Sequence, residues 1–174
     1  ADVDGDTVTM LDNSEEETMS VVTTAITIDL NGKTITRVGT ALSVTADLTI
    51  TDESNTRSIG TINATGNAGR GAQITNGATL TLDNVTMNDG TIANTANSGS
   101  AVYFNSPGTF TMNGGTVTSA HEALRLQEGA VATINDGTLN AGAFGVIIGT
   151  TAGTFNLDGG TVNSDGMGLC NNGT

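Results

Sequence analysis

The chain of 174 residues is long enough for one domain, and its 5 basic and 18 acidic residues give a net charge of −13 at pH 7. This charge disfavours nucleic acids and anionic membrane surfaces as partners, because binding to them requires Lys and Arg. The absence of Trp, an aromatic content of 3% and 24 glycines argue against a globular enzyme with a bulky core.

Other features of the composition bear on disulfides, metal sites, membrane insertion and location. The single Cys170 excludes an internal disulfide and a Cys-based zinc site. No stretch approaches the roughly 20 apolar residues of a membrane-spanning helix, so we expect no membrane insertion in this segment. Beyond the N-terminus charge is sparse and the polar residues are mainly Thr, Asn and Ser, which is more usual for an extracellular protein than for a cytosolic one.

Acidic residues are concentrated at the start of the chain, in the segment that ends at Glu17. They are Asp2, Asp4, Asp6, Asp12, Glu15, Glu16 and Glu17. The turn formed by Asp2, Asp4 and Asp6 is a candidate calcium site, because hard cations favour several carboxylate oxygens on a short turn. The bidentate Glu that would complete such a loop is not in register, and the alternative is an acidic turn that opens the first strand. We expect no other metal or cofactor.

Short alternating segments of apolar and polar residues then follow one another along the chain. They begin with Val8 and Met10 and continue through residues 26–30 and 48–50. Alternation with a period of two predicts β-strands with one side buried, and the Gly- and Asn-rich stretches between them predict tight turns. Helical periodicity is nearly absent, although residues 120–124 are locally compatible with a helix.

A phrase repeats in the last third of the chain: TFTMNGGTV at 109–117, TINDGTL at 133–139 and TFNLDGGTV at 154–162. Self-similarity at a spacing of about 22 to 23 residues predicts a solenoid, whose coils bury their apolar sides only by stacking. The preceding step, from Leu82 to Met112, is longer, and its extra residues predict a surface loop at about 89–100. We expect positions 1–174 to form a single all-β segment of a longer solenoid, with three parallel sheets and roughly seven coils of about 22–30 residues.

Aligning successive coils on this repeat, which we call the threading, predicts which side chains line the core. They are Val102, Phe104, Phe110, Met112, Val117, Leu124, Leu126, Ile134, Leu139, Val146, Ile148, Phe155, Leu157 and Val162. His121 and Glu122 are expected at a corner. At another corner of each coil an Asx residue recurs, and the resulting ladder consists of Asp83, Asn113, Asn135 and Asp158. Stacked amides can hydrogen-bond along the axis, so we interpret these positions as structural.

Few residues are suited to catalysis. Arg57, Arg70, Arg125 and His121 are the candidates for an electrophilic or general-acid role, and the acids of the later coils mostly occupy corners. No Ser-His-Asp order, metal-ligand spacing or phosphate loop is present, so we predict no catalytic or cofactor-binding residue. The threading instead aligns Tyr103, Arg125, Ile147 and Cys170 in one outward column, a mildly apolar strip that we interpret as a possible contact surface.

Outward threonines offer one further alternative. Thr79-x-Thr81 and Thr109-x-Thr111 stack, and regular Thr-x-Thr ladders on a flat sheet can order water and bind ice. The next ranks, Val131-x-Thr133 and Thr154-x-Asn156, break the array. Because Thr is also favoured on solvent-facing strands, we interpret these positions as ordinary strand surface.

The segments GDTVTML at 5–11, AITIDLNGKTI at 25–35 and LTITD at 48–52, together with the later Asn-Gly-Gly-Thr phrases, resemble the pectate-lyase-like right-handed parallel β-helix. Within that superfamily the chain is most similar to large adhesin-like surface proteins of bacteria. The likeness covers nearly the whole chain, but its motifs are core and corner residues, which specify fold better than function. The Asp clusters and His-Gly or Arg-x-Lys elements of the catalytic members do not stand in this sequence.

The resemblance implies a non-catalytic structural or adhesive module, secreted and held at the bacterial cell surface. Its partners would be carbohydrate or host-matrix protein, and self-association into an oligomer or filament is compatible with exposed strand edges. Two alternatives remain open at this point. One is a phage tail fibre, tailspike or surface filament, and the other is a polysaccharide lyase or hydrolase.

Overall fold

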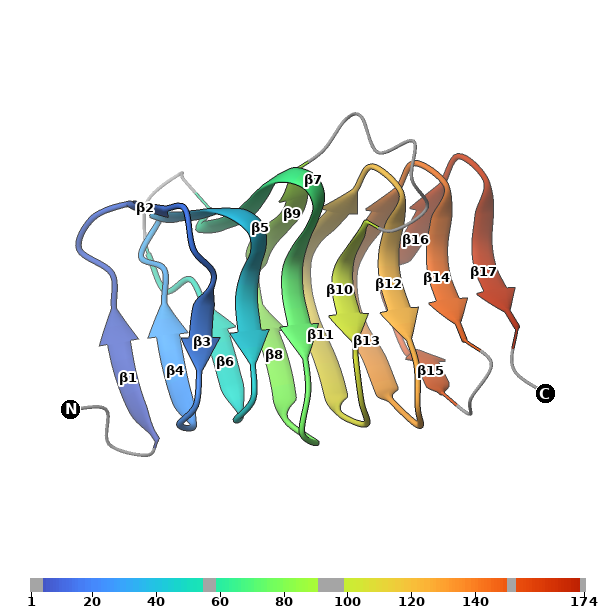
Figure 1. Cartoon of the computed structure of the whole chain (residues 1–174), viewed down its shortest axis with the longest axis horizontal. Coiled ribbons are helices and arrows are strands. Elements are labelled where there is room, and N and C mark those ends of the chain that lie inside the picture. Colours follow the sequence, from blue (N-terminus) through green and yellow to red (C-terminus); the bar gives the residue numbers. More distant parts are fainter. Residues whose placement is uncertain (1–4, 55–58, 91–98, 150–152, 173–174) are drawn as a thin grey trace.

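The computed structural model describes residues 5–54, 59–90, 99–149 and 153–172. All regular structure in these ranges is β-strand, in 17 strands that pair in parallel. The described residues form no helix, and therefore none long and apolar enough to cross a membrane. The predicted all-β parallel solenoid is confirmed (Figure 1).

Three faces, here called A, B and C, enclose the core, and each consists of described strands in parallel register. Face A comprises β1 (Asp6–Thr9), β4 (Ile26–Asp29), β6 (Leu48–Thr51), β8 (Thr79–Asp83), the first parts of β11 (Thr109–Ser119) and β13 (Val131–Ala141), and β15 (Thr154–Leu157). Face B comprises β2 (Ser14–Glu16), the first parts of β5 (Thr34–Val44) and β7 (Thr61–Ile74), β9 (Val85–Gly90), the second parts of β11 and β13, and β16 (Thr161–Ser164).

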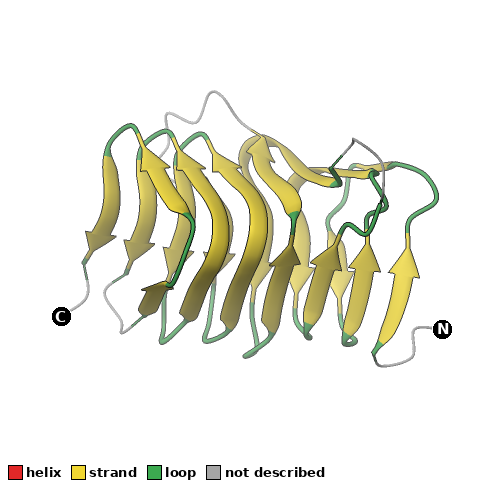
Figure 2. Ribbon diagram, turned by 180° about the vertical axis from the view of Figure 1, so that it is seen from behind, coloured by secondary structure: helices red, strands yellow, loops and turns green. Residues whose placement is uncertain are grey.

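Face C completes each coil. It comprises β3 (Ser20–Val22), the second parts of β5 and β7, β10 (Ser100–Phe104), β12 (Glu122–Leu126), β14 (Phe144–Ile148) and β17 (Met167–Asn171). The long strands turn a corner between two faces without a break in the chain, as Figure 2 shows from behind. At these corners the pairing register shifts, for example between Val38 and Thr40 in β5.

The core is a narrow apolar shaft along the coil axis. Phe110 pairs with Leu80 on one side and with Ala132 on the other, and Ala132 pairs with Phe155. Phe110, Leu80 and Ala132 have no exposed surface. Because burying a Leu or Phe side chain contributes about 1.5–3 kcal/mol, these stacked columns supply most of the stability of the fold.

The expected core residues are buried except in the coil formed by β15, β16 and β17. There Phe155 and Val162 are only partly buried, and Leu157 is 49% exposed, so the prediction of a buried Leu157 is wrong. Leu157 does lie in register with Ile134, as its alternation requires. Its exposure has a simple physical reason: no described strand stacks on the outer edge of this coil.

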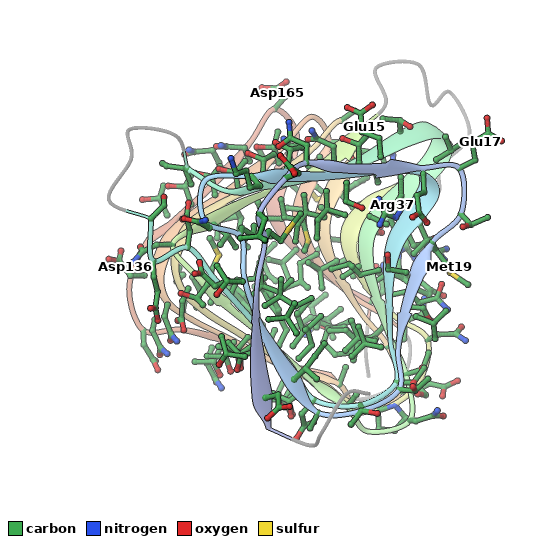
Figure 3. All side chains as sticks on the ribbon, turned by 90° about the vertical axis from the view of Figure 1, so that its left-hand side faces the viewer. Glu15, Glu17, Met19, Arg37, Asp136 and Asp165 are labelled. Carbon is green, nitrogen blue, oxygen red and sulfur yellow. The ribbon has the colours of Figure 1, made fainter. Side chains whose placement is uncertain are left out.

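One polar side chain occupies the interior near the start of the chain. Arg37 is 5% exposed and points into the coil (Figure 3). Its guanidinium donates to the Ser14 carbonyl at 3.0 Å, the Ser14 hydroxyl at 2.9 Å and the Ser20 hydroxyl at 3.2 Å. Arg37 therefore ties β5 to both β2 and β3, a structural role that the sequence did not indicate.

The corner between faces A and B is tight enough to require glycine. Gly115 has φ of +87°, and a Cβ at this position would lie 2.1 Å from the carbonyl oxygen of Val85. The backbones of consecutive coils are therefore in direct contact here. The loop predicted at about 89–100 falls mostly on residues 91–98, which lie outside the described residues; β9 ends at Gly90 and β10 begins at Ser100.

Candidate functional site

The predicted contact strip is a continuous column on the outer side of face C. Tyr103 pairs with Arg125, Arg125 with Ile147, and Ile147 with Cys170, and Gln73 precedes them. Ile147 is only 5% exposed although it lies outside the apolar shaft. The outer side of face C is therefore partly covered by its own side chains.

A buried carboxylate lies beside this column. Glu122 begins β12, next to the corner at which it was expected, and it is fully buried. Its carboxylate accepts hydrogen bonds from the Ser100 hydroxyl at 2.6 Å and from Arg125 Nε at 2.7 Å, and Arg125 Nη2 forms a second, very short contact. The Nδ1 atom of His121 lies 3.3 Å from the same carboxylate. The charge on Glu122 is thus balanced within the protein.

A second acidic residue lies near Glu122, at the corner where faces B and C meet. Asp89 accepts hydrogen bonds from the Ser119 hydroxyl at 2.5 Å and from the Ala120 backbone N–H at 2.9 Å. Burial raises the pKa of Asp89 above its usual value, and the hydrogen bonds from Ser119 and Ala120 only partly oppose this. We refer to Asp89, Ser100, Ser119, His121, Glu122 and Arg125 as the Glu122 cluster.

Arg70 and Tyr103 extend the Glu122 cluster along face C. The Arg70 guanidinium lies 3.9 Å above the centre of the Tyr103 ring and donates to the Gln73 side chain at 2.7 Å. Burial lowers the pKa of Arg70, and the charge of Arg125 acts in the same direction. The Nε atom of Arg70 is buried without a hydrogen-bond partner in the described structure. Tyr103 thus serves as the apolar support of a cation.

The chemistry available to the Glu122 cluster is limited. Glycoside hydrolysis requires one carboxyl that donates a proton to substrate and another that attacks or activates water. Glu122 has no exposed surface and is occupied by Ser100 and Arg125, and Asp89 is occupied by Ser119 and Ala120. With these contacts, both carboxylates stabilise a corner of the solenoid.

The outer side of face B carries a different pattern, which we call the Thr/Asn array. It has two columns in coil-to-coil register. The first column is Thr34, Thr61, Thr86, Thr116, Thr138 and Thr161, and the second is Thr36, Asn63, Asn88, Thr118, Asn140 and Asn163. All of these side chains are uncharged hydrogen-bonding groups, and the inward residues between the two columns, such as Val117, form the core.

Amides of the Thr/Asn array hydrogen-bond along the coil axis. Asn88 donates to Asn63 at 2.9 Å, and Asn163 donates to Asn140 at 3.0 Å. Since each amide has two N–H donors and an oxygen with two lone pairs, one such bond leaves several groups available to a ligand. The array is therefore a regular polar surface whose hydrogen-bonding capacity is not exhausted by the protein.

A shallow groove lies along the second column of the array. Its volume is about 560 Å³, and its lining comes from three successive coils: Thr118, Ser119, Asn140, Ala141, Gly142, Val162, Asn163, Ser164 and Asp165. Asp165 projects outward in the view along the coil axis (Figure 3). The groove therefore runs in the direction in which the coils stack, across the strands.

Face A carries a longer threonine column than the sequence indicated. Thr7, Thr27, Thr49, Thr81, Thr111 and Thr133 lie in register, followed by Asn156. Asn156 donates to the Thr133 hydroxyl at 3.3 Å. The expected break of the Thr-x-Thr array is confirmed, because Val131 pairs with Thr109 and Asn156 pairs with Thr133. The single column of threonines on face A nevertheless extends further toward the start of the chain.

The Asx ladder lies at the corner between faces A and B. The side chain of Asn113 donates to Asp83 at 2.6 Å, and that of Asn135 donates to Asn113 at 2.7 Å. Asp158 follows with its backbone N–H bound to the Ile134 carbonyl at 2.9 Å. The three linked side chains support the exposed corner along the axis.

The predicted calcium turn lies largely outside the described residues. Asp2, Asp4 and the candidate Arg57 lie outside the described residues, and Asp6 is exposed at the start of β1. Within residues 5–54, 59–90, 99–149 and 153–172, no three His, Cys, Asp or Glu side chains are grouped so that they could hold a metal ion.

No family model, curated protein or solved structure matches the chain. The site must therefore be interpreted from its own residues. The structure places the predicted strip and ladder in columns, and it adds the Glu122 cluster and the Thr/Asn array. A signal for the array was present in the sequence as Thr-x-Thr or Thr-x-Asn at 34, 61, 86, 116, 138 and 161.

Proposed function

We propose that this chain is a non-catalytic structural and adhesive segment of an extracellular bacterial surface protein, with the pectate-lyase-like right-handed β-helix as its fold type. The observation that carries the proposal is the contrast between its surfaces. Uncharged Thr and Asn columns are presented outward over successive coils of face B, whereas the groups capable of acid–base chemistry on face C are bound to one another.

The shape of the molecule supports the same function. Stacked coils form a stiff rod whose outer side chains repeat at about 4.8 Å, the spacing of adjacent strands. An extended partner can contact many equivalent side chains of such a rod, and weak contacts then add up. The low lysine content and the Thr- and Asn-rich surface fit an extracellular setting.

A glycan array and a host-matrix protein array probed with the labelled chain test this proposal. We expect specific binding that persists at high salt, because the exposed columns are uncharged. An array without signal, with its positive controls intact, would leave a purely structural segment. Release of reducing sugar ends from any bound glycan would contradict the absence of catalysis.

A further inference from the structure

We propose that the groove on face B binds a neutral, extended polysaccharide chain that lies along the coil axis. Thr118, Asn140 and Asn163 form the hydrogen bonds to this chain, one coil after another. The inference rests on the proposed adhesive function and assigns to it a ligand class and a place on the molecule.

The direction of the groove indicates an extended ligand. Its lining residues come from the same positions of three consecutive coils, so equivalent groups recur at intervals of about 4.8 Å along the groove. An extended polysaccharide places successive sugar rings at an interval close to this spacing, and every ring carries hydroxyl groups. One sugar ring can therefore meet one coil over the length of the groove.

The chemistry of the lining fits sugar hydroxyl groups. Asn140 and Asn163 offer both donors and acceptors, and among the described residues one bond joins the two amides. Val162 belongs to the inward column with Val117 and Leu139, so the hydrogen-bonding amides, and not an apolar floor, provide the contact with the sugar. Ser119 and Ser164 stand at the corner side of the groove.

Charge selects a neutral chain over an acidic one. Asp165 is the charged residue of the lining, and no Lys or Arg is among the described residues that form the groove. The whole chain carries a net charge of −13, so a polyanion would be repelled at long range. The described arginines of the later coils, such as Arg125, belong to face C and not to the groove.

The composition of the second column also argues for a chain rather than for an ice lattice. An ice-ordering face requires a regular threonine array, whereas this column combines Thr118 with Asn140 and Asn163. The threonine column of face A lies on another side of the solenoid and provides an internal control.

Affinity electrophoresis tests the inference. The intact chain is run through native gels that contain galactomannan or hydroxyethyl cellulose as neutral chains, or alginate or polygalacturonate as acidic ones. We expect retardation by a neutral polysaccharide and none by the acidic pair. The double variant Asn140→Ala/Asn163→Ala should weaken the apparent affinity about tenfold, because it removes two hydrogen-bonding amides from the groove.

The matched control is Thr133→Ala/Asn156→Ala. It removes the equivalent hydrogen-bonded pair from the same two coils on face A, and it should leave retardation unchanged. Thermal unfolding of each variant establishes that it is folded. Three results would overturn the inference. They are an equal loss of affinity in both double variants, retardation only by the acidic chains, and no retardation by either neutral chain. Freezing-point depression that the face A control abolishes, without neutral-glycan binding, would overturn it as well.

These outcomes are distinct from a failure of the proposed function. Array signals from proteins or acidic glycans, without retardation by neutral chains, would refute the groove assignment and leave the adhesive role intact. Shortening of a bound neutral polysaccharide would refute the non-catalytic role, even where the groove variant confirms the place of binding.

Discussion

Faces B and C are built from the same coils and share strands β5 and β7, but their outer surfaces have opposite characters. Face B presents uncharged side chains with unused hydrogen-bonding capacity. Face C carries two contacting pairs, Arg125 with the fully buried Glu122 and Arg70 with Tyr103. The inward residues form the apolar shaft that all the coils share, so the outer columns are free to differ from face to face.

The difference shows where charge is used in this protein. On face C charged groups are desolvated, and each depends on its partner for a favourable energy. On face B the side chains remain solvated and individually contribute little to stability. Substitutions on face C should therefore lower the stability more than substitutions on face B. Substitutions on face B should lower the binding of a ligand more than substitutions on face C.

The largest effect is expected from removal of the buried carboxylate. Glu122→Ala leaves Arg125 without its acceptor and Ser100 without its bond, so the free energy of unfolding should fall by about 3 kcal/mol. Urea unfolding followed by circular dichroism measures the loss. The matched change on face B, Asn140→Ala, should stay within about 0.5 kcal/mol of the parent. Equal losses from the two substitutions would remove the contrast between the faces.

A smaller loss is expected at the other arginine of face C. Arg70→Ala removes the stack on Tyr103 and the bond to Gln73, and it should lower the free energy of unfolding by about 1 kcal/mol. Tyr103→Phe retains the ring and should retain most of the stability. If Tyr103→Phe destabilised the protein as much as Arg70→Ala, the phenol hydroxyl rather than the cation–ring contact would be responsible.

Two aspartates should give opposite pH dependences of stability. Burial raises the pKa of Asp89 in the native state. Its contribution to the free energy of unfolding is therefore fully present below the usual pKa of 3.8, and it is lost as the pH rises through the higher native pKa. Asp52 is also partly desolvated, which raises its pKa, but hydrogen bonds from Ser54, Gly60 and Gly32 outweigh this and lower it. The contribution of Asp52 to the free energy of unfolding is present above pH 3.8, and it is lost as the pH falls through the lower native pKa.

Urea unfolding between about pH 3 and about pH 7 tests this difference. Relative to the parent, Asp89→Asn should gain stability as the pH rises, and Asp52→Asn should lose it. His121 and Glu122 also face Asp89, and both residues are present in the parent and in the variant. Parallel curves for the two variants would contradict the assigned pKa directions.

The smallest effect is expected at the exposed corner ladder. Asn113→Ala removes the bonds to Asp83 and Asn135, and it should cost about 0.5–1 kcal/mol because water replaces the lost partners. Asn113→Asp should cost more, since it places two carboxylates side by side. Thermal unfolding at low and high salt separates the two variants, because salt should relieve only the charge repulsion. A greater loss from the alanine variant would show that the ladder acts through packing.

The strands and their inward sides could be predicted because alternation is a local property of the sequence. Phe110, Met112 and Val117 are recognised as inward residues from their immediate neighbours. Alternation fails where a strand turns a corner. Ala123 and Leu124 are consecutive and both fully buried, so alternation does not account for the burial of Ala123 beside the corner.

Surface columns were harder to predict, because the coils differ in length. Thr7 aligns with Thr27 and Thr49 aligns with Thr81, and the second of these steps along the chain is much longer than the first. A search for a repeat of constant length therefore does not align the threonines of the face A column. The hydrogen bond between Asp89 and Ser119 likewise joins two residues across a coil of unusual length.

Alternation and repeat spacing are enough to specify a solenoid of short parallel strands, because each inward apolar residue needs an apolar neighbour in the coils above and below it. The character of the outer faces follows from how the coils stack in three dimensions. Whether a threonine, an asparagine or a glutamate on the outside is solvated or buried depends on which residues of other coils stack beside it. That depends on coil lengths and on corners, which no local pattern specifies.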